Sequence, residues 1–209
     1  MVNDPYRKLA VHYDRFVGPF THALRHIGME MVPVKPGMKV LEVGCGTGTN
    51  LVSYRQAGCP VYGIDLSPSM VEIARAKLGE GVDIQLGDAS SMPYQGDFFD
   101  LVIAMFSFHE MPAEVRPLVM GEMIRVTKQG GRILVTDFHP GPIRFPMGWI
   151  YKAIILFIER AAGREHFSNY RDFLSQKGLP GLVETQKLIV DRRKIVSGGN
   201  IALFLLTRT

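Results

Sequence analysis

A glycine-rich loop after a short apolar run constrains the fold of this chain most strongly. Residues 39–50 read Lys-Val-Leu-Glu-Val-Gly-Cys-Gly-Thr-Gly-Thr-Asn, so glycines occupy the alternate positions 44, 46 and 48. Such a run, turning through glycines into a helical segment, is typical of the first strand and first helix of a nucleotide-binding α/β fold. Gly44 permits the tight turn, Gly46 lets a ligand approach the backbone, and Gly48 lets the helix pack closely on the strand.

The spacing and charge of this loop favour one kind of ligand over another. A dinucleotide-binding loop has its third glycine five residues after the first, where this chain has Thr49. Glu42 lies just before the loop, and its carboxylate would repel a pyrophosphate but attract an ammonium or sulfonium group. The loop therefore argues against a nicotinamide cofactor. Cys45 lies within the binding loop as a small packing residue, and we assign it no chemistry.

Length and composition predict one globular domain spanning residues 1–209. The chain is 46% apolar and 21% charged, with a net charge of +4 and no dense Lys/Arg run in its first half. Nucleic acid is therefore not an expected partner. Cys45 and Cys59 supply neither a disulfide framework nor a zinc quartet, so we expect no metal and a reducing, cytoplasmic setting. The start of the chain lacks the basic and apolar blocks of a signal peptide.

The residues before the glycine loop predict a helical lid. Residues 6–32 have helical character, and Gly18-Pro19 is expected to break or kink the helix. Because this segment precedes the first strand, we expect residues 1–36 to lie across the mouth of the ligand site. Tyr13 either contacts the ligand there or packs as an ordinary amphipathic tyrosine.

Two more carboxylates follow predicted strands in the cofactor-binding core, residues 37–138. Asp65 ends the strand 61–65, about 20 residues beyond the first glycine, where a carboxylate can accept both hydroxyls of a ribose. Ser67-Pro68 then caps and begins a helix. The third strand, 82–89, ends near Asp88, which either contacts the ligand or caps a turn.

The fourth predicted strand carries the candidate catalytic residue. Residues 98–106 are almost continuously apolar, as in a central parallel strand. His109 and Glu110 follow at its carboxyl end, the edge at which open α/β sheets bind ligands. A helix over 113–126 and a fifth strand over 132–138 come next.

Four motifs between residues 38 and 138 together resemble those of the class I S-adenosylmethionine-dependent methyltransferases. They are Glu-x-Gly-x-Gly-x-Gly, Gly-x-Asp-x-Ser-x-x-Met, the acid after strand three, and Arg-Val-x-x-x-Gly-Gly-Arg-Ile-Leu-Val-x-Asp-Phe. The chain is most similar to the ubiquinone/menaquinone-biosynthesis and small-molecule group (methyltransferase type 11). The resemblance implies a Rossmann-like, doubly wound, seven-stranded α/β sheet with an antiparallel last strand, and S-adenosylmethionine as the cofactor.

The resemblance also implies roles for individual residues. Leu66 and Met70 would flank the adenine, while Asp88 and the backbone N–H of Ala89 would bond its edge. Many members of the group carry paired histidines after strand four, whereas this chain has His109-Glu110. His109 is the candidate general base, although it could only shape the pocket or cap a turn. The expected cofactor-binding residues are Tyr13, Glu42, Gly44, Cys45, Gly46, Gly48, Asp65, Leu66, Met70, Asp88, Ala89 and Met105.

The last third of the chain predicts the acceptor side. Residues 139–168 read as a helical insertion, and residues 169–209 as a last helix (169–177) followed by a hairpin of strands at 182–190 and 200–206. The cluster 191–194 reads as a solvated turn. As a helix, 149–158 is apolar almost all round, with only a thin stripe through Lys152 and Glu159. Its apolar surface must pack under the lid or meet a lipid-like substrate, a membrane or a dimer partner.

The sequence therefore predicts an enzyme that transfers a methyl group from S-adenosylmethionine to a small molecule. The acceptor is expected to be apolar or amphipathic, for example quinone-like or a lipid headgroup. The protein is expected in the cytoplasm, with peripheral membrane contact through 149–158 as one option, and its oligomeric state stays open. A non-catalytic S-adenosylmethionine-binding scaffold and, less favoured, an NAD-dependent oxidoreductase are the alternatives.

Overall fold

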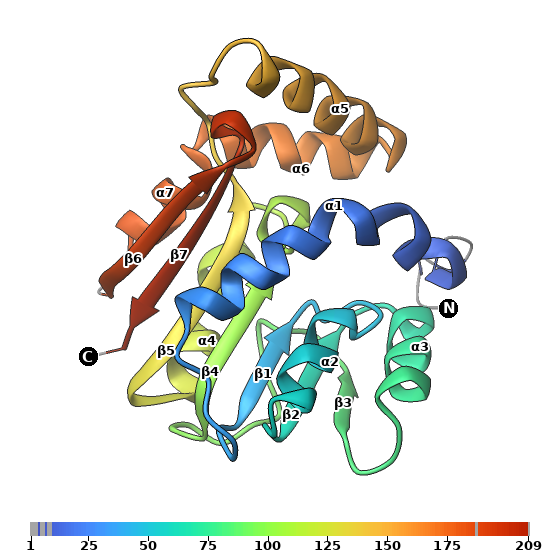
Figure 1. Ribbon diagram of the computed structural model, residues 1–209, viewed down its shortest axis with the longest axis vertical. Helices are drawn as coiled ribbons and strands as arrows, with labels where there is room; N and C mark the ends of the chain where they lie inside the picture. Colours follow the sequence, from blue (N-terminus) through green and yellow to red (C-terminus); the bar gives the residue numbers. More distant parts are fainter. Residues whose placement is uncertain (1–3, 5–6, 8–9, 187, 209) are drawn as a thin grey trace.

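A seven-stranded sheet forms the middle layer of the protein, with helices on both faces (Figure 1). The computed structural model describes residues 4, 7, 10–186 and 188–208. The five strands at one side of the sheet pair in parallel, and the last strand of the chain is antiparallel to both of its neighbours. The doubly wound, Rossmann-like fold class is thus confirmed. In order across the sheet, the strands are β3 (Asp83–Leu86), β2 (Val61–Asp65), β1 (Val40–Val43), β4 (Phe99–Met105), β5 (Thr127–Phe138), β7 (Ile201–Thr207) and β6 (Ile189–Val196).

The helices divide between the two faces and one edge of this sheet. Figure 1 shows α1 crossing the face that also carries α2, while α5 and α6 lie together beyond the carboxyl ends of β4 and β5. In the described part of the chain, the helices are α1 (Ala10–Met31), α2 (Thr49–Gln56), α3 (Pro68–Leu78), α4 (Arg116–Val126), α5 (Met147–Ala161), α6 (Arg164–Ser175) and α7 (Gly178–Glu184), with the short 3-10 turns η1 (Phe108–Glu110) and η2 (Ser197–Gly199).

The central strands are apolar on both faces because helices cover both. Leu41 of β1, Val102 of β4 and Leu206 of β7 are completely buried. Full burial of one such side chain stabilises the fold by about 1.5–3 kcal/mol. This layer fixes the strand ends, from which the loops of the candidate site project.

A break or a kink was predicted at Gly18-Pro19 of helix α1, and the helix does not break there. It is continuous from Ala10 to Met31 with Pro19 inside it, and Figure 1 shows it bending along its course. The Gly18 carbonyl accepts hydrogen bonds from Thr21 Oγ1 at 3.3 Å and Arg25 Nη2 at 3.5 Å.

The C-terminal region departs from the prediction in two places. Helix α6 begins at Arg164 rather than 169, because Gly163, with φ 126°, already separates it from α5. Residues from 182 onward were predicted as a strand, but α7 covers residues 178–184 instead. Its buried Leu179, Leu182 and Val183 have the i, i+3, i+4 spacing of a helix rather than the alternation of a strand.

The predicted solvated turn at 191–194 is part of strand β6. This strand lies at the edge of the sheet and pairs only with β7 among the described strands. Its side chains are exposed, so the charged run stays in water even though the backbone is paired. Solvation of the charges was thus predicted correctly, and the turn was wrong.

Helix α5 turns a polar stripe toward the protein and its apolar face toward solvent. It buries Glu159 and Gly148 on the side that faces the protein, whereas Phe157 is 75% exposed and Trp149 is 58% exposed. Lys152, on the same inner stripe, bonds the Tyr170 hydroxyl of α6 at 2.8 Å. The apolar face is therefore not packed under the lid. Within the described ranges, no helix combines the length and apolar character needed to cross a bilayer.

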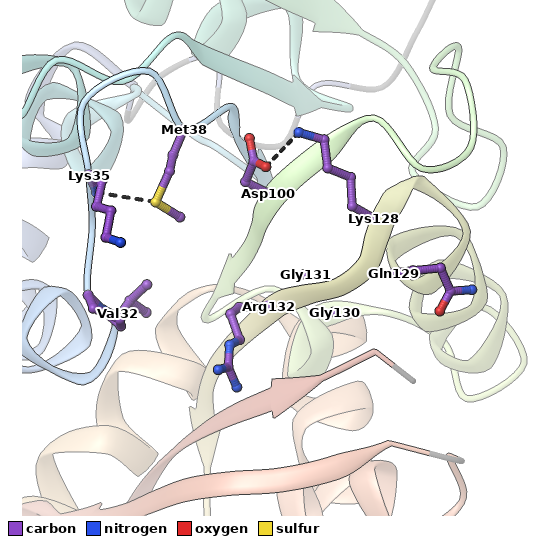
Figure 2. A pocket seen from close by; sticks show the side chains of 10 residues that line it. Val32, Lys35, Met38, Asp100, Lys128, Gln129, Gly130, Gly131 and Arg132 are labelled. Carbon is purple, nitrogen blue, oxygen red and sulfur yellow. Dashed lines mark hydrogen bonds and ion pairs between the residues drawn. The ribbon is translucent and has the colours of Figure 1, made fainter.

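A shallow cavity of about 310 Å³ opens at the amino ends of the strands (Figure 2). The Asp100–Lys128 ion pair, at 2.5 Å, lies at its margin. Ligands of open α/β sheets bind at the opposite, carboxyl edge. The glycine loop and the histidines lie at that opposite edge, so we place the candidate site there.

Candidate cofactor and acceptor site

The glycine loop leaves open space at one position only. Gly44, Gly46 and Gly48 have φ values of 65°, 52° and 72°, in the left-handed region. A Cβ on Gly44 would lie 2.5 Å from Ser107 Oγ, and one on Gly48 would lie 2.9 Å from a Leu78 methyl. A Cβ on Gly46 would meet nothing within 4 Å. The backbone of Gly46 is thus the part of the loop that a ligand can approach.

Glu42 presents an unused acceptor beside this loop. Its side chain is buried in β1, and Oε1 accepts a hydrogen bond from Asn50 Nδ2 at 2.8 Å. No described residue bonds its second oxygen, Oε2. Burial raises the pKa of Glu42 to about 8, although the Asn50 bond and the charge of Arg25 lower it. An ammonium group would satisfy the free oxygen and stabilise the ionised carboxylate.

Asp65 borders the glycine loop and bonds its backbone. It ends β2, where its two oxygens accept from the backbone N–H groups of Gly46 at 2.8 Å and Ser67 at 2.9 Å. Burial raises its pKa. Each carboxylate oxygen keeps a second lone pair, which can accept a hydroxyl. The geometry therefore suits the ribose-binding role expected for Asp65.

The residues expected around an adenine lie at the neighbouring strand ends. The Gly87 N–H donates to the Asp65 carbonyl at 3.0 Å, so the loops after β2 and β3 lie side by side. Leu66 is 66% exposed, Ala89 is half-buried, and Met70 is buried in α3. Asp88 is exposed and accepts from the Ser90 N–H at 2.8 Å, so it caps a turn in this structure.

Cys45 and Met105 have less direct roles. The Cys45 thiol lies against Gly63, where a Cβ would come within 2.8 Å of its sulfur. Burial raises the pKa of this thiol well above its usual range, which keeps it unreactive. Met105 is half-buried at the end of β4, and with Thr136 it lines a small internal cavity.

Helix α1 is tied over the glycine loop by Asp14. Its carboxylate accepts from Thr47 Oγ1 at 2.6 Å and Thr49 Oγ1 at 2.9 Å, and pairs with Lys77 of α3. The adjacent Tyr13 is half-buried. Burial raises the pKa of its phenol above the usual range, and the charges of Glu110 and Asp65 raise it further. Tyr13 thus lies between the cofactor side and the histidine side of the site.

His109 is held by Asp137, a partner that sequence reasoning missed. His109 Nδ1 lies 2.9 Å from Asp137 Oδ1, and the second Asp137 oxygen accepts from the backbone N–H groups of Phe108 and His109. Asp137 lies near the end of β5, next to β4 in the sheet. The neighbouring Glu110 is 4.0 Å from Nε2 and orients the ring less directly.

The charges around His109 argue against its expected role as a general base. Burial lowers its pKa, but Asp137, Glu110 and Glu159 together raise it to about 9. The ring is therefore protonated at neutral pH, and both of its nitrogens face carboxylates. A protonated imidazole cannot take up a proton from the molecule that receives the methyl group. The role of His109 as a general base therefore stays a prediction, and it requires a neutral ring.

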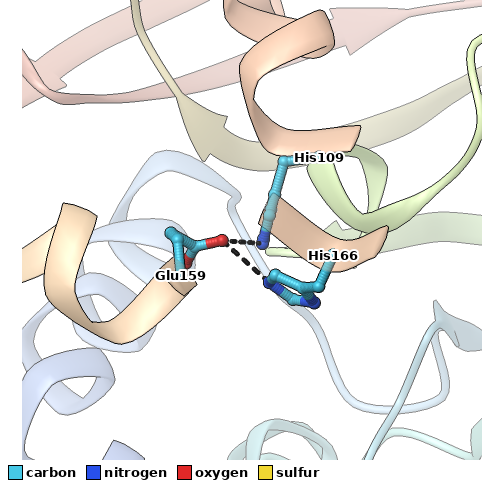
Figure 3. Close-up of side chains that lie close together, drawn as sticks. All are labelled: His109, Glu159 and His166. Carbon is cyan, nitrogen blue, oxygen red and sulfur yellow. Dashed lines mark hydrogen bonds and ion pairs between the residues drawn. The ribbon is translucent and has the colours of Figure 1, made fainter. Parts of the chain in front are cut away.

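A second histidine completes a buried cluster (Figure 3). Glu159 Oε2 of α5 lies 3.5 Å from His109 Nε2 and 2.8 Å from His166 Nε2 of α6. Sequence reasoning singled out neither Glu159 as a site residue nor His166. The only hint was an acid within an otherwise apolar helix.

Comparison with known proteins identifies the core. Residues 40–131 match the family model of a methyltransferase domain. This chain carries a methyltransferase domain. A demethylmenaquinone methyltransferase of Renibacterium salmoninarum is 35% identical over 127 residues, which cover 59% of this chain and 52% of that protein. This chain thus spans about half the length of that relative.

Two further similarities cover more of the chain. A demethylmenaquinone methyltransferase of Bacillus cytotoxicus is 28% identical over 205 residues, covering 91% of this chain and 85% of that protein. The crystal structure of an S-adenosylmethionine-dependent methyltransferase from Aquifex aeolicus superposes with a TM-score of 0.61, at 21% identity, over 88% of this chain and 89% of that one. At that identity the structural likeness shows the fold.

The cofactor of this methyltransferase family is S-adenosylmethionine. Three observations in the loop fit it. The free oxygen of Glu42 suits its ammonium group, the carboxylate of Asp65 suits its ribose hydroxyls, and the space at Gly46 admits it to the backbone.

A matched pair of glycine variants tests this placement of the cofactor. Gly46→Ala and Gly44→Ala both place an alanine at a left-handed φ, which costs about 1–2 kcal/mol. Gly44→Ala adds a clash with Ser107 and should lower the free energy of unfolding further. Gly46→Ala should keep more stability but lower S-adenosylmethionine affinity by about tenfold or more, an effect of at least ~1.4 kcal/mol. Urea unfolding and calorimetry measure the two effects, and unchanged affinity in Gly46→Ala would place the ligand elsewhere.

Proposed function

We propose that this protein transfers a methyl group from S-adenosylmethionine to a small acceptor that is apolar or amphipathic. The observation that carries the proposal is the inverted helix α5, which lies next to the site and exposes its apolar face. The names of the relatives, which are demethylmenaquinone methyltransferases, support an acceptor of quinone-like character.

The residues of the chain would act mainly by binding and exclusion of water. S-adenosylmethionine supplies an electrophilic methyl group, and methyl transfer is an in-line displacement that depends on positioning. Glu42 would hold the ammonium end and Asp65 the ribose. Asp14 ties α1 over the loop, which shields the site from water. Tyr13 borders both halves of the site and would contact the acceptor side.

The face of α5 also suits a membrane surface. Trp149, Ile150, Ile154 and Phe157 are exposed large apolar side chains on this helix. Exposed cations flank them at Arg144, Arg160 and Arg164. An apolar face bordered by cations is typical of helices that lie in the interface of anionic bilayers. We therefore propose peripheral membrane contact, through which the protein would reach a lipid-soluble acceptor.

The proposed activity is tested with labelled S-adenosylmethionine. The protein is incubated with a panel of reduced quinones, lipids and polar amines or acids, and methyl incorporation is measured. Methylation of an apolar or amphipathic member supports the proposal. Methylation of polar acceptors alone would contradict the acceptor class, and no transfer to any acceptor would favour a non-catalytic role.

The role of Asp65 yields a separate prediction. Asp65→Ala should weaken S-adenosylmethionine binding by roughly 1.5–3 kcal/mol, because a charge-assisted hydrogen bond to the ribose is lost. Isothermal titration calorimetry measures the affinity, and circular dichroism checks the fold. Glu72→Ala, which removes an exposed acid from α3, is the matched control and should bind normally. Equal affinity in Asp65→Ala would show that the ribose lies elsewhere.

A further inference from the structure

We infer that His109, Glu159 and His166 form a binding site for a divalent transition-metal ion of the zinc class. One ligand atom from each residue lies within 4.8 Å of the others (Figure 3). The three residues come from η1, α5 and α6, which are separate elements brought together at the carboxyl edge of the sheet. Although the cysteine count suggested no metal, this set contains no cysteine.

The ligand types match such an ion. Two imidazole nitrogens and one carboxylate oxygen form the protein ligand set of several zinc sites in which a fourth position stays open. Imidazole also disfavours Mg²⁺ and Ca²⁺, which prefer oxygen ligands. Bonds of about 2.0–2.2 Å place tetrahedral ligand atoms roughly 3.3–3.5 Å apart. The separation of 3.5 Å between Glu159 Oε2 and His109 Nε2 fits that spacing, whereas the 2.8 Å between Glu159 Oε2 and His166 Nε2 is a hydrogen bond that the ion would replace and lengthen.

A buried carboxylate behind His109 already orients this ligand. Asp137 is completely buried and faces His109 Nδ1 at 2.9 Å, which directs Nε2 toward Glu159. Metal-bound histidines usually donate their other N–H to a carboxylate in this way, and the ion would replace the proton on His109 Nε2, which is released to solvent. The backbone N–H groups of Phe108 and Phe138 hold Asp137 itself, at 3.0 Å and 2.7 Å.

The place of Glu159 on its helix is a separate observation that favours a site. Only 5% of Glu159 is exposed, whereas the neighbouring Phe157 and Ile158 are 75% and 43% exposed. Burial of a carboxylate is costly unless it is paired or bound to a metal, and an apolar residue at this position would be easier to bury. The fold therefore holds a carboxylate between two imidazoles where packing alone would favour a hydrophobic side chain.

Zinc titration of the metal-free protein tests the inference. Protein dialysed against a chelator is titrated with Zn²⁺ by calorimetry, and bound metal is counted after gel filtration. We expect one ion per chain. Loss of a ligand should exceed the 10- to 100-fold effect that is typical of outer-shell changes. We therefore expect His166→Gln and Glu159→Gln each to weaken Zn²⁺ binding by roughly 100-fold or more.

Controls separate loss of the site from loss of the fold. His166→Gln keeps a hydrogen-bond donor toward Glu159, and circular dichroism and S-adenosylmethionine affinity report whether the variants remain folded. Glu165→Gln, which changes an exposed acid next to His166, should bind Zn²⁺ like the wild type. No stoichiometric uptake, or uptake unchanged in both ligand variants, would overturn the inference. Because the readout is metal binding, its result is independent of whether methyl transfer is found.

Discussion

Glu42→Gln is expected to weaken S-adenosylmethionine binding and, at the same time, to stabilise the cofactor-free protein at pH 8. The amide keeps the shape of the side chain but cannot pair with an ammonium group. Loss of a hydrogen bond between charged groups amounts to roughly 1.5–3 kcal/mol, or about 10- to 150-fold in affinity. The free Oε2 of Glu42 makes this the sharpest test of the cofactor placement.

The stabilising half of this prediction follows from the pKa of Glu42. Burial raises it from the ordinary 4.5 to about 8, so folding favours the neutral carboxyl. The corresponding stability is complete below pH 4.5 and is lost as the pH rises through about 8. Glutamine is neutral throughout, so the advantage of the variant should appear above pH 4.5 and grow toward pH 8.

Thermal unfolding of the cofactor-free proteins between pH 5 and 8.5 measures this difference, and calorimetry measures the affinity. Glu72→Gln, an exposed acid on α3, serves as the control for a general effect of removing one charge. A Glu42→Gln protein that binds normally would contradict the ammonium assignment. A variant less stable than the wild type at pH 8 would show that the buried carboxylate is paired in the free protein.

Removal of the apolar face of α5 is expected to abolish binding to anionic vesicles. Trp149→Asp combined with Phe157→Asp deletes two exposed apolar side chains and adds two negative charges. Each large side chain that leaves water contributes about 1.5–3 kcal/mol, so the loss should reach roughly 3–6 kcal/mol before the charges are considered. Sedimentation with vesicles of acidic and neutral lipids measures the effect, and binding of the wild type should weaken as salt increases.

Leu118→Asp is the matched control, because Leu118 is 57% exposed on α4, away from α5. Calorimetry with S-adenosylmethionine should give the same affinity for the double variant and the wild type, since neither residue lies near the loop. A wild type that does not sediment with any vesicle would refute the membrane contact. If it instead forms a dimer that the double variant cannot form, the face is a subunit interface.

The loop and the fold were predictable because local geometry dictates them. Glycines at 44, 46 and 48 are required by left-handed backbone angles, and the alternation of apolar strands with helices determines the sheet. His109 was singled out for the same reason, since it follows closely after a strand end. Its partner Asp137 was not found, because their pairing depends on which strand lies next to β4 in space.

The features of the C-terminal third that the sequence did not predict also depend on contacts between distant elements. Glu159 and His166 meet His109 only because α5 and α6 fold back over the strand ends, and nothing local in the sequence specifies that approach. Residues 191–194 were predicted as a turn because a run of four charged side chains does not fit a strand that is buried on both faces. They are compatible at an edge, where every side chain can reach water.

That charged edge has a consequence for how molecules of this protein meet. An uncovered strand offers its backbone to any other strand, and sheets that join in this way aggregate. Arg192, Arg193 and Lys194 lie along β6, so a second copy approaching in register would bring like charges together. The protein therefore exposes an apolar helix, α5, while the β6 edge of its sheet resists the addition of another strand. Self-association through the β6 edge is therefore opposed by charge.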